Sequence, residues 1–426
     1  MNKKKVLIIT YYWPPAGGPG VQRWLKFVKY LPEFNVEPIV FIPENPNYPL
    51  IDNSLKSEVS DDITIIKYPI KEPYRVAGIL SKKSSQTMSK GVISEEKKQS
   101  FIEKFMLFIR GNFFIPDARI SWVKPSANVL LEIIEKEKID TLITTGPPHS
   151  VHLIGLRLKE KRGLRWLADF RDPWTSIGYH KQLRITKNAE RKHKKLENCV
   201  LNSADQLLVT SNNTKSEFRK ITNRPIEVIT NGYDDEPVID FEKDKKFTIA
   251  HIGSLLSKRN PMNLWKALSE LVKENHEFAK DLQIRFVGVV GENILESLRD
   301  LNLSDYFDDI GYVSHNQSIM YQKKSQLLLL IEIDSEETKS IIPGKLFEYM
   351  VSGRPIISIG PKDTDVEKII KETNTGNHFY YDDYESLKSI ILEHYKAFKN
   401  DELETYPIGL QKYHRKSLTH SLSKLL

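Results

Sequence analysis

The sequence predicts an α/β protein built from two Rossmann-like domains, and three observations lead to this prediction. A chain of 426 residues suits two domains of ordinary size. Residues 6–42 have the pattern of a buried strand, a Gly/Pro loop, an amphipathic helix and a second strand. Residues 327–359 follow the same order, with an apolar strand on each side of a helix. Strand–helix–strand units of this kind form parallel sheets that helices cover.

Composition limits the class of protein and its partners. The chain has 63 Lys and Arg against 56 Asp and Glu, a net charge of +7, so anionic lipid, phosphorylated substrates and nucleic acid are candidate partners. We expect no nucleic acid, because no binding motif accompanies the charge. The single cysteine, Cys199, excludes internal disulfides and a cysteine-rich metal site, and fits a reducing compartment.

The chain also carries a predicted membrane-contacting segment. No apolar stretch reaches the ~18 residues of a spanning helix, and the start, MNKKK, does not have the pattern of a secretory signal. We therefore expect a cytoplasmic protein. Residues 73–115 predict an insertion with a basic amphipathic helix, in which Lys97 and Lys98 precede several phenylalanines. Such helices lie on anionic membranes, and ordinary core packing is the alternative.

The loop at residues 13–20 follows the first predicted strand, Val6 to Tyr12. It lacks the G-x-G-x-x-G order, so a dinucleotide site is only weakly indicated. Its glycines, Gly17 and Gly18 among them, would let the backbone approach a ligand at the carboxyl edge of the sheet. A flexible connector is the alternative interpretation.

Polar side chains follow two further strands of the first domain. His149 comes after a strand and two prolines, and Asp169 and Arg171 follow the next strand. Because ligands bind at the carboxyl ends of parallel strands, we expect His149, Asp169 and Arg171 to line a site. Asp172, which precedes a proline, could instead brace a turn.

The segment Ser340–Gly360, SIIPGKLFEYMVSGRPIISIG, predicts an anion site in the second domain. Gly344 precedes a helix that begins at Lys345, and helix N-termini that follow strand and loop bind anions. A lysine in the first turn is disfavoured by the helix dipole, so it indicates a strongly anionic ligand. Glu348, one turn on, could accept hydrogen bonds from sugar hydroxyls. A solvated Lys–Glu pair is the alternative.

Several of these motifs resemble one enzyme family. The segments PGKLFEYMVSGRPII, TTGPPHSVHL, RWLADFRDPW and YYWPPAGGPGVQRWLKFVKYLP resemble family-four retaining glycosyltransferases with the GT-B fold, in the sub-branch with P-G-K-x-x-E-Y. The resemblance extends from Val6 to Leu426. It implies two facing Rossmann-like domains with a cleft between them. It also implies transfer of a sugar from a nucleotide-sugar to a hydroxyl acceptor, of the hexosyltransferase type. We expect a glycan or lipid-linked acceptor from cell-envelope polysaccharide assembly.

The resemblance assigns donor-site roles to residues of the second domain. Glu348 would hold the ribose, while Gly344 and Lys345 would lie at the diphosphate. The backbone of Tyr312 and Val313 would read the nucleobase. In the first domain, the loop with Gly17 and Gly18 would lie against the donor phosphate and the acceptor.

Two positions depart from the family pattern. In the family's G-R-L-x-x-x-K-G loop, this chain has Ser254 at the usual Arg and Arg259 at the usual Lys, so one positive charge is missing. The first of two glutamates common in the family falls at Ser340, which removes the usual contact to the donor sugar. Arg259 and Lys345 would still stabilise charge on the leaving diphosphate.

The same resemblance places the domain boundaries. The strand closed by Asn231–Gly232 resembles the family's hinge, which gives domains 1–232 and 233–404 and a helix within 405–426 that packs back on the first domain. The D-x-D at 363–365 is better explained as a helix cap than as a metal site. We expect no metal and no cofactor.

Two other functions are alternatives to a glycosyltransferase. One is a GT-B-type sugar-nucleotide epimerase, and the other is a non-catalytic nucleotide-binding partner protein.

Overall fold

The computed structural model describes residues 3–72, 101–177, 180, 183–235 and 241–426. Its contacts divide the chain into two compact units. Unit 1 consists of Met1–Asn231 and Arg415–Leu426, and unit 2 consists of Gly232–His414. Each unit has its own parallel sheet and its own hydrophobic core.

Unit 1 is built on a seven-stranded sheet in the order β3-β2-β1-β4-β5-β6-β7. All of its strand pairs are parallel. The central strands are buried on both faces, which explains why their sequences are almost continuously apolar. The strands are β1 (Lys4–Thr10), β2 (Val36–Pro43), β3 (Thr64–Tyr68), β4 (Thr141–Gly146), β5 (Arg165–Phe170), β6 (Gln206–Val209) and β7 (Ile226–Val228).

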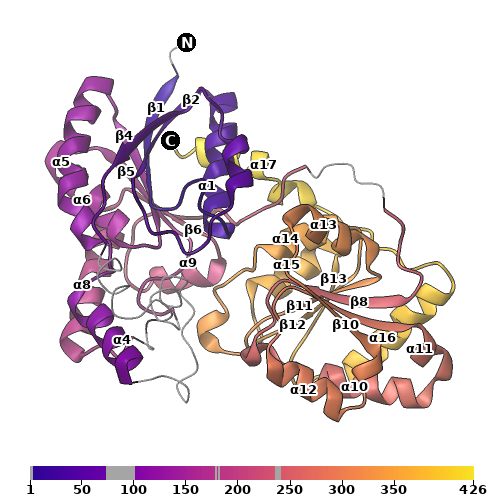
Figure 1. Cartoon of the computed structure of the whole chain (residues 1–426). Coiled ribbons are helices and arrows are strands. Elements are labelled where there is room, and N and C mark those ends of the chain that lie inside the picture. Colours follow the sequence, from indigo (N-terminus) through magenta and orange to yellow (C-terminus); the bar gives the residue numbers. More distant parts are fainter. Residues whose placement is uncertain (1–2, 73–100, 178–179, 181–182, 236–240) are drawn as a thin grey trace. The chain divides into compact units, whose positions relative to one another are not determined.

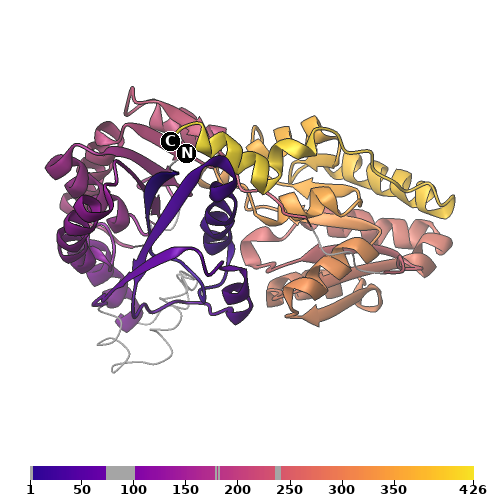
Figure 2. The same ribbon diagram turned by 90° about the horizontal axis from the view of Figure 1, so that it is seen from above.

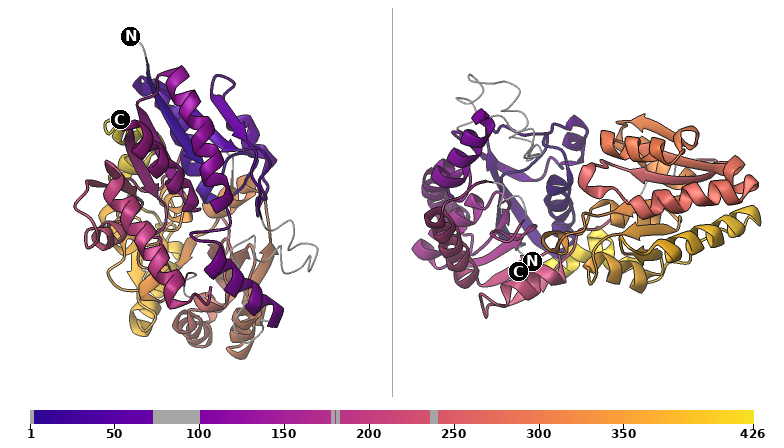
Figure 3. Two further views of the ribbon diagram at one scale, coloured as in Figure 1. Left: turned by 90° about the vertical axis from the view of Figure 1, so that its left-hand side faces the viewer. Right: turned by 90° about the horizontal axis from the view of Figure 1, so that it is seen from below.

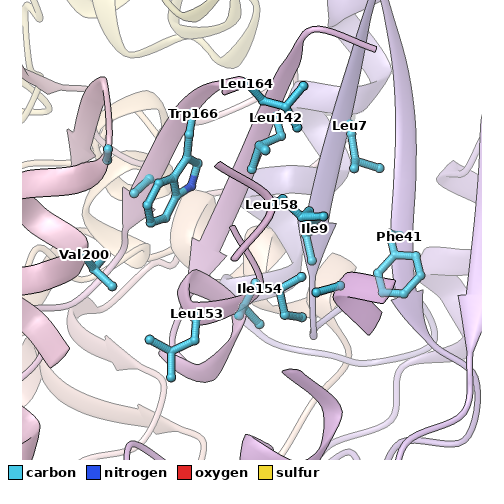
Figure 4. Close-up of a cluster of buried hydrophobic side chains, with 14 of the residues drawn as sticks. Leu7, Ile9, Phe41, Leu142, Leu153, Ile154, Leu158, Leu164, Trp166 and Val200 are labelled. Carbon is cyan, nitrogen blue, oxygen red and sulfur yellow. The ribbon is translucent and has the colours of Figure 1, made fainter. Parts of the chain in front are cut away.

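Helices cover both faces of this sheet (Figures 1 and 2). The helices α5, α6, α8 and α9 contribute to the core on one face, where the indole of Trp166 lies among leucines of β4 and α6 (Figure 4). The helices α1 and α17 cover the other face. The helices of unit 1 are α1 (Pro19–Tyr30), α4 (Phe101–Phe113), α5 (Ile120–Glu137), α6 (Ser150–Arg162), α8 (Lys187–Ser203), α9 (Asn212–Phe218) and α17 (Arg415–Ser423).

The helix α17 belongs to unit 1 although it follows all of unit 2 in the sequence. Leu418 and Leu422 are buried in the core beneath α1. The Nζ of Lys4 donates a hydrogen bond to the carbonyl oxygen of Leu426 at 2.9 Å, so both ends of the described chain meet on this unit (Figure 3). Unit 1 is therefore assembled from two separate segments.

Unit 2 is built on a six-stranded parallel sheet in the order β10-β9-β8-β11-β12-β13. Its strands are β8 (Phe247–Ile252), β9 (Leu282–Val287), β10 (Phe307–Gly311), β11 (Leu327–Ile331), β12 (Ile356–Ile359) and β13 (Gly376–Phe379). One face carries α10 (Met262–Glu274), α11 (His276–Asp281), α12 (Glu292–Asp300) and α16 (Tyr384–Lys399), and the other carries α13 (His315–Lys324), α14 (Lys345–Val351) and α15 (Asp365–Thr373) (Figure 1).

The predicted first strand is shorter in the structure. It ends at Thr10, because Tyr11 and Tyr12 already belong to the loop. The predicted capping role of the D-x-D segment is confirmed, but the capping side chain is Thr364, whose hydroxyl accepts from the amide of Glu367.

The predicted amphipathic helix of the insertion is present as α4. Phe105 and Phe113 are exposed by 56% and 72%, while Leu107 is buried, so part of its apolar surface faces outward. Lys97, Lys98 and the remainder of 73–100 lie outside the described residues. In the part of the chain that the structure describes, no helix combines the length and apolarity needed to span a membrane.

Candidate functional site

The predicted anion-site segment lies at the carboxyl edge of the unit 2 sheet. Gly344 is the N-cap of α14, and Lys345 is its first residue. The hydroxyl of Tyr349 accepts a hydrogen bond from the amide of Ile252 at 2.9 Å, which fixes α14 to the end of β8. The helix buries its apolar face, with Leu346, Phe347 and Met350 in the core.

Lys345 extends across the end of β8. Its Nζ lies 3.1 Å from Nε2 of His251, whose Nδ1 lies 3.0 Å from the carbonyl oxygen of Leu329. Gly253 follows β8 with a φ of +115°, and a Cβ there would lie 2.8 Å from the Nζ of Lys345. A glycine is therefore required at this position for both its conformation and its close approach to the ammonium.

Arg259 supplies a second cation to the same cluster. Its Nη1 donates to the carbonyl oxygen of Ser254 at 3.3 Å, and its Nε is buried without a hydrogen-bond partner among the described residues. Burial, followed by the positive charge of Arg259, lowers the pKa of Lys345 to about 7. Within the described ranges, no carboxylate forms an ion pair with either cation. Two neighbouring cations without a carboxylate partner favour an anionic ligand.

Glu348 is held by a residue that sequence reasoning missed. Its Oε2 accepts a hydrogen bond from Nε2 of Gln322, a buried residue of α13, at 3.1 Å. Glu348 itself stays partly exposed. Tyr312 and Val313 follow β10, and Tyr312 is 84% exposed. Among the described residues, no hydrogen bond links this pair to Lys345 or Glu348.

A buried carboxyl group, also missed, lies directly after β11. Glu332 is 5% exposed, and its Oε2 has no hydrogen-bond partner in the described part of the chain. Burial raises the pKa of Glu332 to about 8, and the charge of Arg259 opposes that shift. The available signal was the strand sequence LLLLIEI, where one charged residue interrupts an apolar run.

In unit 1, Arg171 joins three loops at the carboxyl edge of the sheet. Its Nε donates to the carbonyl oxygen of Gly146 at 3.2 Å, and its Nη2 donates to that of Pro147. Its guanidinium lies 5.7 Å from the ring centroid of Tyr12. A Cβ at Gly20 would lie 2.1 Å from Nη1, so the start of α1 must be a glycine for Arg171 to reach this place. Arg171 thus connects the predicted loops.

His149 caps α6 close to these loops. Its ring stacks on Trp174, with centroids 4.7 Å apart and planes at 4°. The side chain is buried, yet neither ring nitrogen has a hydrogen-bond partner among the described residues. Burial, with smaller effects of His152 and Arg171, lowers the pKa of His149 well below its usual value, so the ring is neutral. By contrast, His152 bonds Thr144 at 2.8 Å inside the core.

Asp169 is placed differently from the expectation that it lines a site. It lies inside β5, is fully buried, and pairs with Arg23 at 2.8 Å. Trp24 and Thr145 donate to its Oδ2 at 2.7 and 2.8 Å. Burial would raise the pKa of Asp169, but Arg23 and these donors hold it below its usual value. The carboxylate is thus satisfied within the core, where it joins α1, β4 and β5.

The Gly/Pro loop after β1 is held by the segment 50–52. The amide of Gly17 donates to the carbonyl oxygen of Leu50 at 3.0 Å, and the amide of Asp52 donates to that of Pro15 at 2.8 Å. The Gly17 amide is already paired, so a phosphate contact there would require this pairing to open. Gly18 has a φ of +96°, and no atom lies within 4 Å of a Cβ added there. A glycine is therefore favoured at this position by the backbone conformation and not by a lack of space.

No group of three or more His, Cys, Asp or Glu that could hold a metal ion occurs in the described ranges.

The sequence was compared with protein families and with curated proteins. The sequence profile of Glycosyltransferase Family 4 matches residues 92–237. No curated protein sequence matches the chain significantly.

Solved structures match the chain over nearly its full length. Sucrose-phosphate synthase from Thermosynechococcus elongatus superposes with a TM-score of 0.61 at 12% identity, covering 99% of this chain and 98% of that one. HepE from Anabaena, solved with UDP, gives 0.61 at 11% identity, covering 99% of each chain. The lipopolysaccharide outer core galactosyltransferase WaaB gives 0.56 at 15% identity, again with 99% of each chain. The chain has the GT-B fold.

Solved glycosyltransferases such as WaaB share this fold with the chain. The fold does not by itself separate a transferase from an epimerase. A putative UDP-N-acetylglucosamine 2-epimerase from Listeria monocytogenes also superposes on this GT-B chain, with a TM-score of 0.51 at 14% identity, covering 99% of this chain and 95% of that one.

Proposed function

We propose that this chain is a retaining, metal-independent glycosyltransferase that moves a sugar from a nucleotide-sugar to a hydroxyl acceptor. The observation that carries the proposal is the pair of cations, Lys345 and Arg259, at the carboxyl edge of the unit 2 sheet. Each lowers the free energy of an anion bound beside it, and no carboxylate of the described chain neutralises them by an ion pair. A diphosphate fits this charge and this place in the fold.

The two cations would act on the leaving group. During transfer, the bond between the anomeric carbon and the diphosphate oxygen breaks, and the acceptor oxygen bonds the same face of that carbon. The acceptor proton goes to the departing phosphate oxygen. Negative charge grows on that oxygen, where preorganised donors stabilise the transition state. A bound diphosphate would raise the pKa of Lys345 and keep its ammonium charged.

Other residues of unit 2 would bind the rest of the donor. Glu348, oriented by Gln322, would accept hydrogen bonds from the ribose. Gly344 would leave room at the diphosphate, and the backbone at Tyr312 and Val313 would meet the base. A nucleotide-sugar donor is supported by HepE, which was solved with UDP and with UDP-glucose.

The acceptor would be a glycan or lipid-linked precursor of a cell-envelope polysaccharide. WaaB, a galactosyltransferase of the lipopolysaccharide outer core, supports this class by its fold. In unit 1, His149 has two free ring nitrogens among the described residues, and Arg171 gathers the surrounding loops. These two would line the acceptor site, together with the loop at Gly17 and Gly18. We place the enzyme in the cytoplasm, at the inner face of the membrane.

A donor panel tests the proposal. UDP-, GDP- and ADP-sugars are incubated with a lipid-linked saccharide, and released nucleotide and the anomer of the product are measured. We expect nucleotide release that depends on acceptor, with the donor's anomeric configuration kept. Turnover of the donor without acceptor would indicate the epimerase. Binding without release would indicate the non-catalytic partner protein, and inversion would refute the retaining mechanism.

A further inference from the structure

We propose that His251 is a positioning residue, which holds the ammonium of Lys345 at the anion site without neutralising it. The inference rests on the proposed function, because it concerns the same anion site. His251 is the last residue but one of β8 and is 1% exposed. It was not identified from the sequence, and it lies between the backbone of the sheet and Lys345.

The hydrogen bonds of the ring determine its tautomer. Nδ1 faces the carbonyl oxygen of Leu329 at 3.0 Å, and a carbonyl only accepts, so Nδ1 carries the proton. Burial, followed by the charge of Lys345, lowers the pKa of His251 well below its usual value, so the ring is neutral. Nε2 is therefore an acceptor, and it receives the ammonium of Lys345 at 3.1 Å.

The choice of a neutral acceptor has a chemical reason. A carboxylate at this place would hold the ammonium equally well, but it would cancel the charge that an anionic ligand needs. An imidazole nitrogen supplies direction without a negative charge. The charged groups that act on Lys345 are Arg259, which lowers its pKa, and Glu348 on its own helix, which raises it. His251 is thus the directional partner among groups that otherwise act at longer range.

The backbone at the end of β8 also lies close to the ammonium of Lys345. A Cβ at Gly253 would lie 2.8 Å from Nζ of Lys345. Behind it, Gly288 has a φ of +131°, and a Cβ there would lie 2.6 Å from the carbonyl oxygen of Gly253. A glycine therefore follows each of the neighbouring strands β8 and β9, and the two glycines pack together. The ammonium of Lys345 lies against His251 and close to the backbone of Gly253.

Two substitutions of His251 separate its two hydrogen bonds. His251→Gln places a side-chain acceptor near the position of Nε2, and His251→Asn keeps only a donor near the position of Nδ1. Affinity for UDP, with GDP in parallel, is measured by calorimetry between about pH 6.5 and 9. Each variant is also made in a Lys345→Met background. Thermal unfolding shows whether each variant folds.

The pH dependence has a defined sign. Lys345 must be protonated to bind the anion, so affinity is highest below its pKa and falls as the pH rises through it. Glu332, with a pKa raised by burial to about 8, ionises in the same range and would also weaken anion binding. The titrations are therefore repeated with Glu332→Gln, which removes that second contribution.

We expect His251→Asn to lower UDP affinity about tenfold or more at pH 7.5, the effect of losing a hydrogen bond to a charged group. Its affinity should also begin to fall at a lower pH than in the wild type. His251→Gln should stay within about threefold of the wild type. In the Lys345→Met background, the two variants should bind UDP equally.

Three results would overturn the inference while leaving the proposed function intact. The first is a UDP affinity that does not change with pH in the Glu332→Gln variant with His251 in place. The second is a folded His251→Gln that loses affinity, and the third is a His251→Asn effect that persists without Lys345. A wild-type protein that binds neither UDP nor GDP would overturn the proposed function and this inference together.

Discussion

The guanidinium of Arg23 and the carboxylate of Asp169 form an ion pair enclosed by unit 1, with Nη2 2.8 Å from Oδ1 and side chains 1% and 0% exposed. Arg23 also donates to the carbonyl oxygen of Thr230 at 2.8 Å, just before the chain leaves unit 1. The pair connects the start of α1 with the sheet and with the exit of the chain.

Asp169→Asn should act on stability and not on chemistry. Removing one charge leaves Arg23 buried without its counterion, so the free energy of unfolding should fall by about 3–5 kcal/mol. Urea denaturation measures this change. Asp140→Asn, at a carboxylate that is 77% exposed, is the control and should stay within about 0.5 kcal/mol. If Asp169→Asn keeps the stability of the wild type but loses turnover, Asp169 takes part in the reaction and this prediction is wrong.

Lys345→Ala and Glu348→Gln should separate two kinds of donor contact. Lys345 meets charge that grows in the transition state, so its loss should lower kcat by a factor on the order of 10²–10³. Glu348 would hold the ribose equally in the ground state and in the transition state. Glu348→Gln should therefore mainly raise the donor KM, by the equivalent of ~1.5–3 kcal/mol of lost binding free energy. Steady-state kinetics with varied donor at saturating acceptor decide between them. Full activity of Lys345→Ala would contradict the mechanism.

Metal dependence is a separate prediction. If Lys345 and Arg259 supply the positive charge at the leaving group, added Mg²⁺ or a chelator should leave kcat and the donor KM unchanged. The same result is expected for Glu348→Gln. The measurement is initial rate after extensive dialysis against chelator, with and without added metal. Abolition of wild-type activity by the chelator would refute the metal-free mechanism.

His149→Ala should lower turnover strongly and leave nucleotide affinity nearly unchanged. The reason is that His149 lies in unit 1, stacked on Trp174, while the cations proposed to bind the diphosphate lie in unit 2. Turnover and UDP affinity are measured in parallel, with His276→Ala on an exposed helix residue as the control. A folded variant that no longer binds UDP would place His149 at the donor instead.

Residues 97–114 should bring the enzyme to anionic lipid. Each Lys or Arg near such a surface contributes ~1 kcal/mol, and Phe105 and Phe113 already face outward. Sedimentation with anionic vesicles should fall with salt and in Lys97→Glu/Lys98→Glu. The exposed pair Lys245→Glu/Lys246→Glu is a control of equal charge change. Equal binding to neutral vesicles, or none to either, would exclude this role.

The fold could be predicted because its signals are local and periodic. Apolar strands alternate with amphipathic helices in residues 6–42 and 327–359, and the structure has a strand, a helix and a second strand in each range. Strand ends were less predictable, because aromatic residues such as Tyr11 suit a buried strand and a buried loop equally well.

The candidate site was predictable only in part, because its contacts join residues far apart in the sequence. Lys345 was predicted from its place at a helix start after a strand and a loop. Arg259 was predicted from the resemblance to the family's loop, and the roles of both residues stay predictions. His251 and Gln322 were missed because each is one polar residue in an ordinary element, and only the fold brings it to Lys345 or Glu348. The sequence around Asp169 does not show that its carboxylate pairs with Arg23, which lies 146 residues earlier in the chain.

The placement of α17 has a consequence for the order in which the protein is made. A ribosome releases residues 1–231 first, yet the core beneath α1 is completed by Leu418 and Leu422, which are synthesised after all of unit 2. Domains generally fold as units while the chain emerges. Here unit 2 is contiguous and can close during synthesis, whereas the earlier-made unit 1 must keep an apolar face open until its partner unit has been translated.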